Sequence, residues 1–370
     1  MFSRYGLLWG GLCLLFAYGC DVGETSDNTG GGGNGSQSSS GVTGSSSGSS
    51  GAMSSSSGMS SSSGGNPSGG YYVQGNKIYD SNGNVRVFRG LARPSHEWSA
   101  QGENISLADF QKIASWGANV TRLSLNQGFW LQGHVKYDAN YQQNIDSAVQ
   151  WAHQAGLDVI LDLHWSDRGD TNNGSPGQQR MADQNSVKFW QSVAAKYKGD
   201  NRVLFELYNE PHDIPWNVWR NGGDSGEGYQ AVGMQQLYDT VRGTGANNLV
   251  LVGGIDWAFD LSGVAQNKVN GNNIVYVTHP YDYPNKAPGS WDANFRSLAA
   301  TDPVFITEFG SFDCSTNYTS TLINYAKDRG LSWTGWAWFP GGCGFPALIN
   351  NWNGDPSAPG QIVKSALQSP

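Results

Sequence analysis

Eight short apolar segments, each followed by a stretch with helical periodicity, recur along this 370-residue chain. The segments with the composition of buried strands are Val85 to Gly90, Asn119 to Leu125, Asp158 to Trp165, Val203 to Glu210, Asn248 to Gly254, Ile274 to Tyr281, Pro303 to Gly310 and Trp333 to Phe339. Strands that alternate with helices form parallel sheets, and eight such units close into a barrel. The alternation therefore predicts an α/β fold, a single (β/α)8 TIM barrel.

The intervening segments carry apolar residues at the spacing of one helix face. They are Leu107 to Trp116 after the N-cap candidate Ser106, Gln142 to Ala155, Ser186 to Lys198, Tyr229 to Arg242, Asp292 to Ala300, Tyr318 to Arg329 and a closing helix from Gln361 to Gln368. After the fifth strand, the segment near Asp260 to Val264 is short and poorly defined. Ahead of the barrel, Tyr72 to Tyr79 and the segment from Val85 flank a turn at Asp80 to Asn84, which predicts an N-terminal β-hairpin.

The first seventy residues differ in composition from the rest. Residues 1–20 combine one positive charge, Arg4, with an apolar run that ends in Ala17-Tyr18-Gly19-Cys20. This pattern is typical of a secretory signal, and its end resembles a bacterial lipobox, so we expect Cys20 to be lipidated, with ordinary signal cleavage as the alternative. Residues 21–70 are almost wholly Ser and Gly, which predicts a disordered linker. The barrel then occupies residues 71–370.

The predicted signal segment implies that the protein is exported, and export bears on the state of the cysteines and on the expected partners. We expect the protein at the cell surface or in the periplasm as a tethered lipoprotein, or secreted. Cys314 and Cys343 follow the seventh and eighth strands, and a disulfide between them is plausible in an exported protein. The net charge of -8 without a basic run argues against nucleic acid, so the expected membrane contact is only a lipid at Cys20. We expect a monomer.

Polar and aromatic residues gather at the carboxyl ends of the predicted strands, where barrels of this type carry their active sites. They are Arg122, His164, Asn209, Glu210, His279, Tyr281, Glu308, Trp336 and Trp338. The two glutamates make a candidate pair of acid and nucleophile. Spacings typical of a metal site or of a phosphate-binding Gly loop are missing from the sequence, so we expect no metal and no cofactor. The 15 Trp and 16 Tyr weakly favour a carbohydrate ligand.

Six motifs fall at the ends of these strands in order: TRLSL, LDLHW, NEP, HPY, TEFG and WAW. On these motifs, from Tyr71 to about Gln368, the chain resembles glycoside hydrolase family 5, the cellulase-type retaining hydrolases. The resemblance implies that Glu210 is the acid/base, with His279 bonded to it, and that Glu308 is the nucleophile, with Tyr281 bonded to it. It also implies that Trp336 is the floor on which the sugar beside the scissile bond stacks.

Several residues have two interpretations. Arg122 lies in an apolar strand and needs a carboxylate partner, which is Glu308 or a deeper acid, Glu206 or Asp162. Glu206 rivals Glu210 as the acid and is better explained as a core partner. Asn209 enters the site only if the strand end twists or bulges, and its amide would then donate to the sugar 2-hydroxyl. His164 contacts substrate or is structural, and Trp338 stacks on sugar or packs in the core. Further candidate platforms are Trp98, Trp130, Trp165, Trp216, Trp257 and Tyr283.

The predicted function is hydrolysis of internal β-1,4-glucosidic bonds in cellulose or a related β-glucan by a retaining mechanism. The same mechanism acting on mannan, xyloglucan or mixed-linkage glucan is the nearer alternative, because substrate choice on this fold lies in the loops. A non-catalytic glycan-binding lipoprotein on a decayed barrel is the more distant one. Intact Glu210 and Glu308 speak against it.

Overall fold

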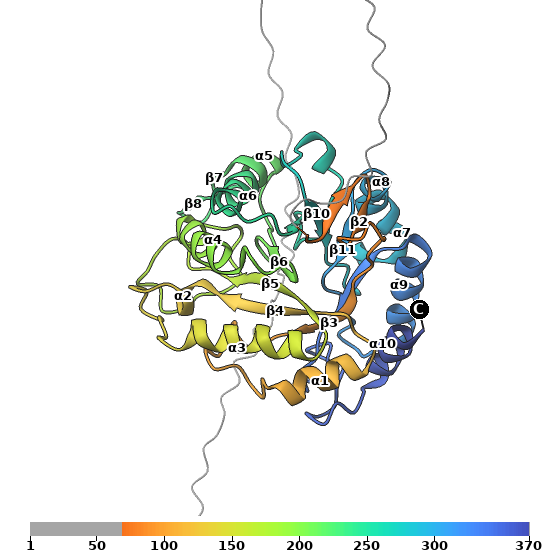
Figure 1. Cartoon of the computed structure of the whole chain (residues 1–370). Coiled ribbons are helices and arrows are strands. Elements are labelled where there is room, and N and C mark those ends of the chain that lie inside the picture. The colour runs from red at the N-terminus through yellow and green to blue at the C-terminus, as the bar shows by residue number, and fades with distance from the viewer. Residues whose placement is uncertain (1–68, 370) are drawn as a thin grey trace, which may run out of the picture. The chain divides into compact units, whose positions relative to one another are not determined.

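A closed barrel of eight parallel strands organises the domain (Figure 1). The computed structural model describes residues 69–369, so the predicted signal segment, Cys20 and nearly all of the linker lie outside the described residues. The barrel strands in chain order are β3 (Arg89–Arg93), β4 (Val120–Asn126), β5 (Asp158–Trp165), β6 (Val203–Glu206), β9 (Val250–Gly253), β10 (Ile274–Thr278), β11 (Val304–Ile306) and β12 (Ser332–Gly335). Because β12 pairs in parallel with β3, the barrel closes and the predicted fold is confirmed.

Helices surround the barrel and bury one face each against it (Figure 1). The longer ones are α1 (Leu107–Ser115), α3 (Tyr141–Gln154), α4 (Gln184–Tyr197), α6 (Met234–Gly243), α9 (Thr316–Arg329) and α10 (Ala358–Gln368). Short helices in the connections are α2 (Gln127–Trp130), α5 (Trp216–Asn221), η1 (Val264–Gln266), η2 (Pro284–Lys286), α7 (Pro288–Trp291), η3 (Asp292–Arg296) and α8 (Ser297–Ala299). Ser106 caps α1 as predicted, because its side chain accepts a hydrogen bond from the backbone N–H of Asp109.

Two helix predictions need correction. The helix predicted from Tyr229 begins only at Met234, because the Tyr229 hydroxyl is held by the backbone of Met181 and the next residues form β8 (Gln230–Ala231), which pairs with β7 (Gly223–Asp224). The stretch from Asp292 winds as a π-helix before α8.

The N-terminal hairpin is present, but its turn lies earlier than predicted. The strands β1 (Tyr72–Gln74) and β2 (Lys77–Tyr79) pair across Gly75, whose φ of +59° suits glycine. The predicted turn at Asp80 to Asn84 also forms, and it leads to a single bridge between Tyr79 and Val85. Residues from Val85 therefore belong to the hairpin side, and the first barrel strand starts at Arg89.

The amino-terminal end of the barrel is closed by apolar side chains. Ile78 from the hairpin packs with inward-facing residues near the starts of the strands, and Tyr71 lies edge-on to Phe88 at 5.0 Å. The inward residues of this layer are Phe88, Val120, Ile160, Leu204, Leu249, Leu251, Val275, Val277 and Phe305. This layer excludes water from below, so polar groups in the next layer can reach solvent only through the opposite end.

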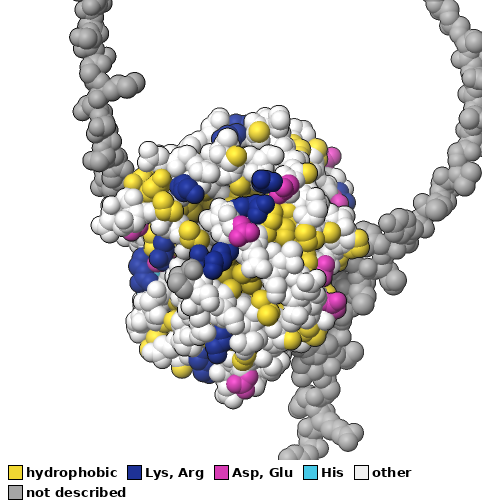
Figure 2. Space-filling model, turned by 90° about the vertical axis from the view of Figure 1, so that its right-hand side faces the viewer, with side chains coloured by type: hydrophobic (Ala, Val, Ile, Leu, Met, Phe, Trp, Pro, Cys, Tyr) yellow, Lys and Arg dark blue, Asp and Glu magenta, His cyan; other side chains and the backbone are white. Residues whose placement is uncertain are grey.

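The surface is mixed in character. On the face of the domain shown in Figure 2, acidic and basic side chains are scattered among uncharged and apolar ones. Within residues 69–369, none of the helices has the length and apolar character needed to cross a membrane.

Candidate active site

Arg122 on β4 is the centre of a charged layer directly above the apolar one. Its guanidinium contacts three carboxylates: Nη1 lies 2.5 Å from Oε1 of Glu308, Nε lies 2.7 Å from Oε2 of Glu206, and Nη2 lies 3.0 Å from Oδ2 of Asp162. All of the partners considered from the sequence are therefore present at once. Burial alone would lower the pKa of Arg122, but these three charges outweigh it and raise that pKa well above its usual range.

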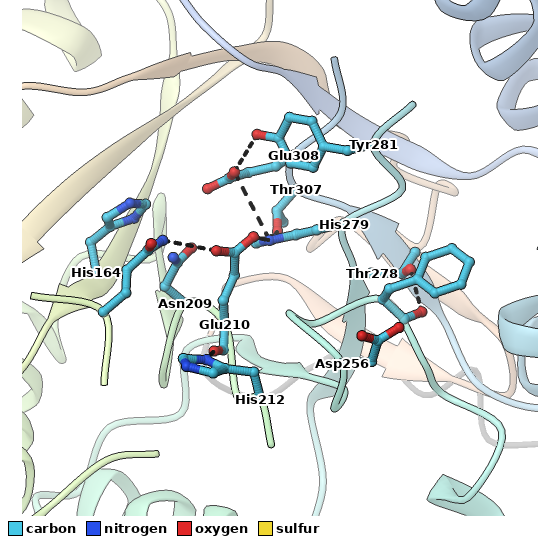
Figure 3. Close-up of polar contacts among 12 residues, drawn as sticks. His164, Asn209, Glu210, His212, Asp256, Thr278, His279, Tyr281, Thr307 and Glu308 are labelled. Atoms are coloured by element: carbon cyan, nitrogen blue, oxygen red, sulfur yellow. Dashed lines mark hydrogen bonds and ion pairs between the residues drawn. The ribbon is translucent and has the colours of Figure 1, made fainter. Parts of the chain in front are cut away.

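Glu210 lies just beyond β6, and each of its carboxylate oxygens has a partner (Figure 3). Oε1 is 3.0 Å from Nδ1 of His279, and Oε2 accepts a hydrogen bond of 2.8 Å from the Gln178 amide. Nε2 of His279 lies 2.8 Å from the Thr307 hydroxyl, which in turn donates to Glu206. The outer carboxylate is thus connected through an imidazole and a hydroxyl to the charged layer below.

Glu308 lies beyond β11 and faces Glu210 across the barrel mouth. The Tyr281 hydroxyl donates to its Oε2 at 2.6 Å, while Arg122 holds its Oε1. One oxygen of Glu210, one oxygen of Glu308 and one ring nitrogen of His279 all lie within 4.8 Å of one another. The two carboxylates therefore meet at one point, as the sequence analysis required.

Asn209 reaches the site because the regular strand has already ended. β6 stops at Glu206, so the strict alternation of side chains is lost before Asn209, and both Asn209 and Glu210 turn toward the barrel axis (Figure 3). Oδ1 of Asn209 accepts a hydrogen bond of 2.7 Å from Nη2 of Arg122. Its Nδ2 is buried without a partner among the described residues, so the amide keeps a donor available.

His164 and Trp336 form one wall beside the two glutamates. Their rings are parallel within 9° and their centroids are 5.5 Å apart. Nδ1 of His164 lies 2.6 Å from Oδ2 of Asp162, and burial lowers the pKa of His164, so its neutral ring is held in one orientation. Both rings keep a small exposed fraction, 5% for His164 and 8% for Trp336.

The pKa values of His279, Glu210 and Glu206 are shifted in different directions. Burial lowers the pKa of His279, but the charges of Glu308, Glu206 and Glu210 overcome that effect and raise the pKa to about 9. Burial raises the pKa of Glu210, yet its hydrogen bond to His279 and the charge of His279 bring it below the ordinary value. Arg122 likewise overcomes burial at Glu206 and lowers that pKa to about 2. The proton of the Glu210 and His279 pair therefore rests on the imidazole in the free site.

Comparison with known proteins identifies the family. The family model described as cellulase, glycosyl hydrolase family 5, matches residues 79–342, which is more than half of the chain. The chain belongs to glycoside hydrolase family 5. An endoglucanase from Clostridium saccharobutylicum is 25% identical over 273 residues, covering 72% of this chain and 56% of that protein. Endoglucanase 5 from Pectobacterium carotovorum subsp. carotovorum is 23% identical over 284 residues, covering 72% and 49%. This chain thus spans about half the length of these curated relatives.

Solved structures agree on the fold. A β-glucanase from Saccharophagus degradans is 25% identical, with a TM-score of 0.66 and coverage of 80% of this chain and 92% of that one. The same enzyme has been solved in complex with cellotetraose, with a TM-score of 0.67, 24% identity and the same coverage.

Three residues of this family 5 domain that the sequence offered as site candidates are core residues instead. Glu206 is fully buried beneath Glu210 and bonded to Arg122, so it is a core partner. Trp338 is buried and donates to Asp109, and Trp130 is buried and donates to Ser192, so neither is a sugar platform. The remaining candidates, Trp98, Trp165, Trp216, Trp257 and Tyr283, keep exposed surface.

A disulfide joins Cys314 and Cys343, with an S–S distance of 2.04 Å. It ties the loop after β11 to the loop after β12, close to Glu308 and Trp336 along the chain.

Three residues that contact or influence the pair escaped the sequence analysis. Gln178 comes from the long loop after β5 and bonds Glu210 directly. Thr307 precedes Glu308, and its hydroxyl links His279 to the charged layer. Lys286 is buried on η2, donates to the backbone of Asp256, and its charge helps to lower the pKa of Glu210. Only Thr307 had a usable signal, since it lies in the TEFG motif.

Glu210, His279 and Glu308 are also the one group of His, Cys, Asp and Glu side chains within residues 69–369 that is compact enough to hold a metal ion. The neighbouring carboxylates raise the pKa of His279 to about 9, so the ring is a proton donor toward Glu210. The arrangement suits proton transfer and nucleophilic attack at a single centre.

Proposed function

We propose that this domain hydrolyses internal β-1,4-glucosidic bonds in cellulose or a related β-glucan by a retaining double displacement. The observation that carries the proposal is the approach of Glu210 and Glu308 to within 4.8 Å. Retaining glycosidases place their two carboxyl groups roughly 5 Å apart, whereas inverting enzymes leave about 6.5–9.5 Å for a water molecule. The endoglucanase relatives and the cellotetraose complex of the S. degradans enzyme support a β-glucan substrate.

In the first step, Glu308 attacks the anomeric carbon while Glu210 protonates the departing glycosidic oxygen. Arg122 and Tyr281 each occupy one oxygen of Glu308, which keeps that group ionised and aimed. The proton required by Glu210 is available from His279 at 3.0 Å. As substrate displaces water, the charged form of Glu210 is disfavoured and the proton moves from the ring to the carboxylate.

In the second step, water replaces the leaving sugar and attacks the glycosyl ester of Glu308. Glu210, now ionised, removes the proton from that water, and Glu308 leaves as a carboxylate. The unpartnered amide of Asn209 supplies the donor for the sugar 2-hydroxyl, a bond that strengthens in the transition state. Trp336 and His164 provide the flat wall for the sugar ring.

The test combines substrate and stereochemistry. We expect reducing-sugar release from soluble cellulose above that from mannan, xyloglucan or mixed-linkage glucan, with the β-anomer as first product by proton NMR. Glu308→Gln should abolish turnover, whereas Asp328→Asn, an exposed acid-to-amide change on α9, should not. Normal activity of Glu308→Gln, or an initial α-anomer, would refute the mechanism. Preferential cleavage of mannan would refute the substrate class.

We further propose that the protein is exported and tethered through a lipid at Cys20, which rests on the sequence of residues 1–20. Metabolic labelling with a fatty acid should mark the wild-type protein. Labelling that persists in Cys20→Ala would contradict the tether.

A further inference from the structure

The ring of His279 has a different kind of partner at each of its two nitrogens (Figure 3). Nδ1 lies 3.0 Å from Oε1 of Glu210, the carboxylate at the barrel mouth. Nε2 lies 2.8 Å from the hydroxyl of Thr307, the residue that follows β11. His279 and Thr307 are both 0% exposed, so neighbouring side chains determine the polar environment of the ring.

The hydroxyl of Thr307 also bonds Glu206, and Glu206 fixes the direction of both bonds. Thr307 donates to Oε1 of Glu206 at 2.9 Å. Glu206 accepts two further hydrogen bonds from the Arg122 guanidinium, at 2.7 and 3.1 Å, which keep the carboxylate ionised and able only to accept. A hydroxyl has a single proton, and here that proton is directed at Glu206. The oxygen of Thr307 therefore faces Nε2 of His279 as an acceptor, and Nε2 carries a hydrogen.

Glu206 does not bond the ring directly. Its Oε1 is 3.6 Å from Nε2 of His279, which is beyond hydrogen-bonding distance, and the Thr307 oxygen lies between the two groups. The backbone of Thr307 is held as well, because its carbonyl accepts a hydrogen bond from the Thr334 hydroxyl on β12. The barrel strands therefore fix the position of this hydroxyl.

The nitrogen that loses its proton decides whether His279 can supply Glu210. When Nδ1 gives its proton, the Nδ1–H bond breaks and the Oε1–H bond forms, which leaves a neutral ring with hydrogen on Nε2 and a neutral carboxylic acid. Loss of the Nε2 proton through the Thr307 hydroxyl would instead protonate Glu206 and leave Glu210 ionised. Arg122 opposes that second route, because it stabilises the ionised form of Glu206.

We propose that Thr307 is a positioning residue for the acid step: its hydroxyl retains the hydrogen on Nε2 of His279 while Nδ1 gives its proton to Glu210. Which nitrogen of a histidine is protonated is set by the hydrogen bond that the other nitrogen makes. Here the bond at the inner nitrogen is anchored to the buried charged layer. This inference rests on the proposed function, in which Glu210 is the acid/base, and it adds the residue that selects the tautomer.

Four carboxylates act on the ring, and none of them replaces the hydroxyl. Glu210 and Glu308 lie 3.0 and 4.0 Å from Nδ1, and Glu206 lies 3.6 Å from Nε2. Asp162 on β5 also interacts with the charge of His279. All four favour the imidazolium form, but none is within hydrogen-bonding distance of Nε2. A change confined to Thr307 therefore tests the inner hydrogen bond and leaves these charges in place.

Nitrogen NMR of the whole protein labelled with isotopic histidine reports the tautomer directly. Glu210→Gln reproduces the neutral state of the acid/base, and its amide can donate to Nδ1 or accept from it, so it does not impose a tautomer. Above the titration midpoint of the ring, we expect hydrogen on Nε2 in Glu210→Gln. Adding Thr307→Ser, which keeps the hydroxyl, should leave this tautomer unchanged. Adding Thr307→Val, which keeps the shape without the hydroxyl, should populate the tautomer with hydrogen on Nδ1. The spectrum of His279→Gln identifies the signals.

The pH dependence of kcat/KM tests the same hydrogen bond in the active enzyme. Cellohexaose has a sugar leaving group that needs protonation, whereas dinitrophenyl β-cellobioside releases a phenolate that needs none. Thr307→Val removes an acceptor from the imidazolium, so on cellohexaose we expect its basic limb to move to lower pH by roughly 1 unit. Above that limb the loss should be about 10-fold, and below it the rate should stay within about threefold of the wild type. On the dinitrophenyl substrate the ratio of variant to wild type should not change with pH.

Two further variants serve as controls for the pH profile. Thr307→Ser should restore the wild-type basic limb on cellohexaose. Thr121→Val removes another buried hydroxyl, which bonds the Leu91 carbonyl from β4, and should leave the limb where it is.

Hydrogen on Nδ1 in Glu210→Gln would overturn the inference, and this measurement does not require Thr307→Val to fold. An unmoved basic limb in Thr307→Val, or an equal shift on both substrates, would also overturn it while leaving the proposed hydrolase intact. A wild-type protein that released product from neither substrate would overturn the proposed function and with it the role in the acid step.

Discussion

The two ends of the barrel are built from the same strands and have opposite chemistry. On β4, β5 and β6 the inward residues Val120, Ile160 and Leu204 pack in the apolar layer that the hairpin closes. Two positions further along each strand, the next inward residues are Arg122, Asp162 and Glu206. Inward-facing side chains two residues apart on one strand therefore belong to two different layers. The first layer stabilises the fold and the second contains the charged groups next to the catalytic pair.

The difference teaches how a buried charge cluster is tolerated. Isolated charges in a dry interior are costly, and ion pairs recover that cost only with close geometry and further hydrogen bonds. Arg122 meets this requirement through three carboxylates and the Asn209 carbonyl. We infer that the apolar layer stabilises the folded state, and that burying the charged layer at the mouth lowers the net free energy of unfolding.

Removing the central cation should have the largest effect. Arg122→Met leaves Glu206, Asp162 and Glu308 without their common partner, so we expect the free energy of unfolding to fall by about 3–5 kcal/mol at neutral pH, with activity lost. The loss should shrink at acidic pH, where the carboxylates take up protons. Urea titrations at several pH values measure it. Arg296→Met, which breaks an exposed pair with Asp292, is the control and should change stability by less than about 1 kcal/mol. A pH-independent loss would contradict this account of the mouth.

A cavity at the apolar end should separate stability from catalysis. Phe305 stacks on Phe88 at 5.9 Å, so Phe305→Ala should lower the free energy of unfolding by about 3–5 kcal/mol. The charged layer is untouched, so kcat per folded molecule should stay at the wild-type value at a temperature where the variant is folded. Val85→Ala, at an exposed position, serves as the control. A large fall in kcat for Phe305→Ala would show that the two layers are not independent.

The disulfide is a stabilising element at the mouth. It closes a loop with a sequence separation of 29, so replacing Cys314 and Cys343 together by Ala should lower stability by about 2–4 kcal/mol. Thermal melts with and without reductant measure the effect. Reductant should destabilise the wild type toward the double variant and leave the variant unchanged. Equal melting of the wild type and the double variant would remove this contribution.

Titration of His279 should make the stability of the folded protein depend on pH. Its pKa of about 9 in the folded protein exceeds the ordinary 6.5, so its contribution to stability is complete below pH 6.5 and is lost as pH rises toward 9. We expect a loss of about 3 kcal/mol across this window, because a rise in pKa of roughly 2.5 corresponds to that free energy. His153 also has a raised pKa, beside Asp200, so the informative quantity is the difference between wild type and His279→Gln, whose curve should be flatter. If the stability of both proteins changed with pH in the same way, His279 would not be the group that titrates in this window.

The sequence was sufficient for the barrel and for the residues at its rim, and it was weakest where strands end. β5 matches its predicted bounds because both ends of its apolar run coincide with the ends of pairing. β6 and β11 end earlier than predicted. After β6, Leu207 N still bonds to Leu251 on β9, but Asn209 N bonds to Leu163 on β5, so the pairing is irregular there. Those early ends allow Asn209 and Glu210 to face the same point, which a period of two cannot show.

Loop residues were inaccessible for a related reason. Gln178 and Lys286 lie in segments without periodicity, and their contacts with the site depend on how each loop folds back over the rim. The hairpin turn was misplaced because two turn-forming sequences, around Gly75 and around Asp80 to Asn84, occur close together and both form.

The hairpin has one more consequence. Because β1 and β2 cover the sealed base of the barrel, the polypeptide joins the domain at the pole opposite Glu210 and Glu308. A ligand that approaches Glu210 and Glu308 therefore does not meet the backbone of residues 69–74, which enters the domain on the other side.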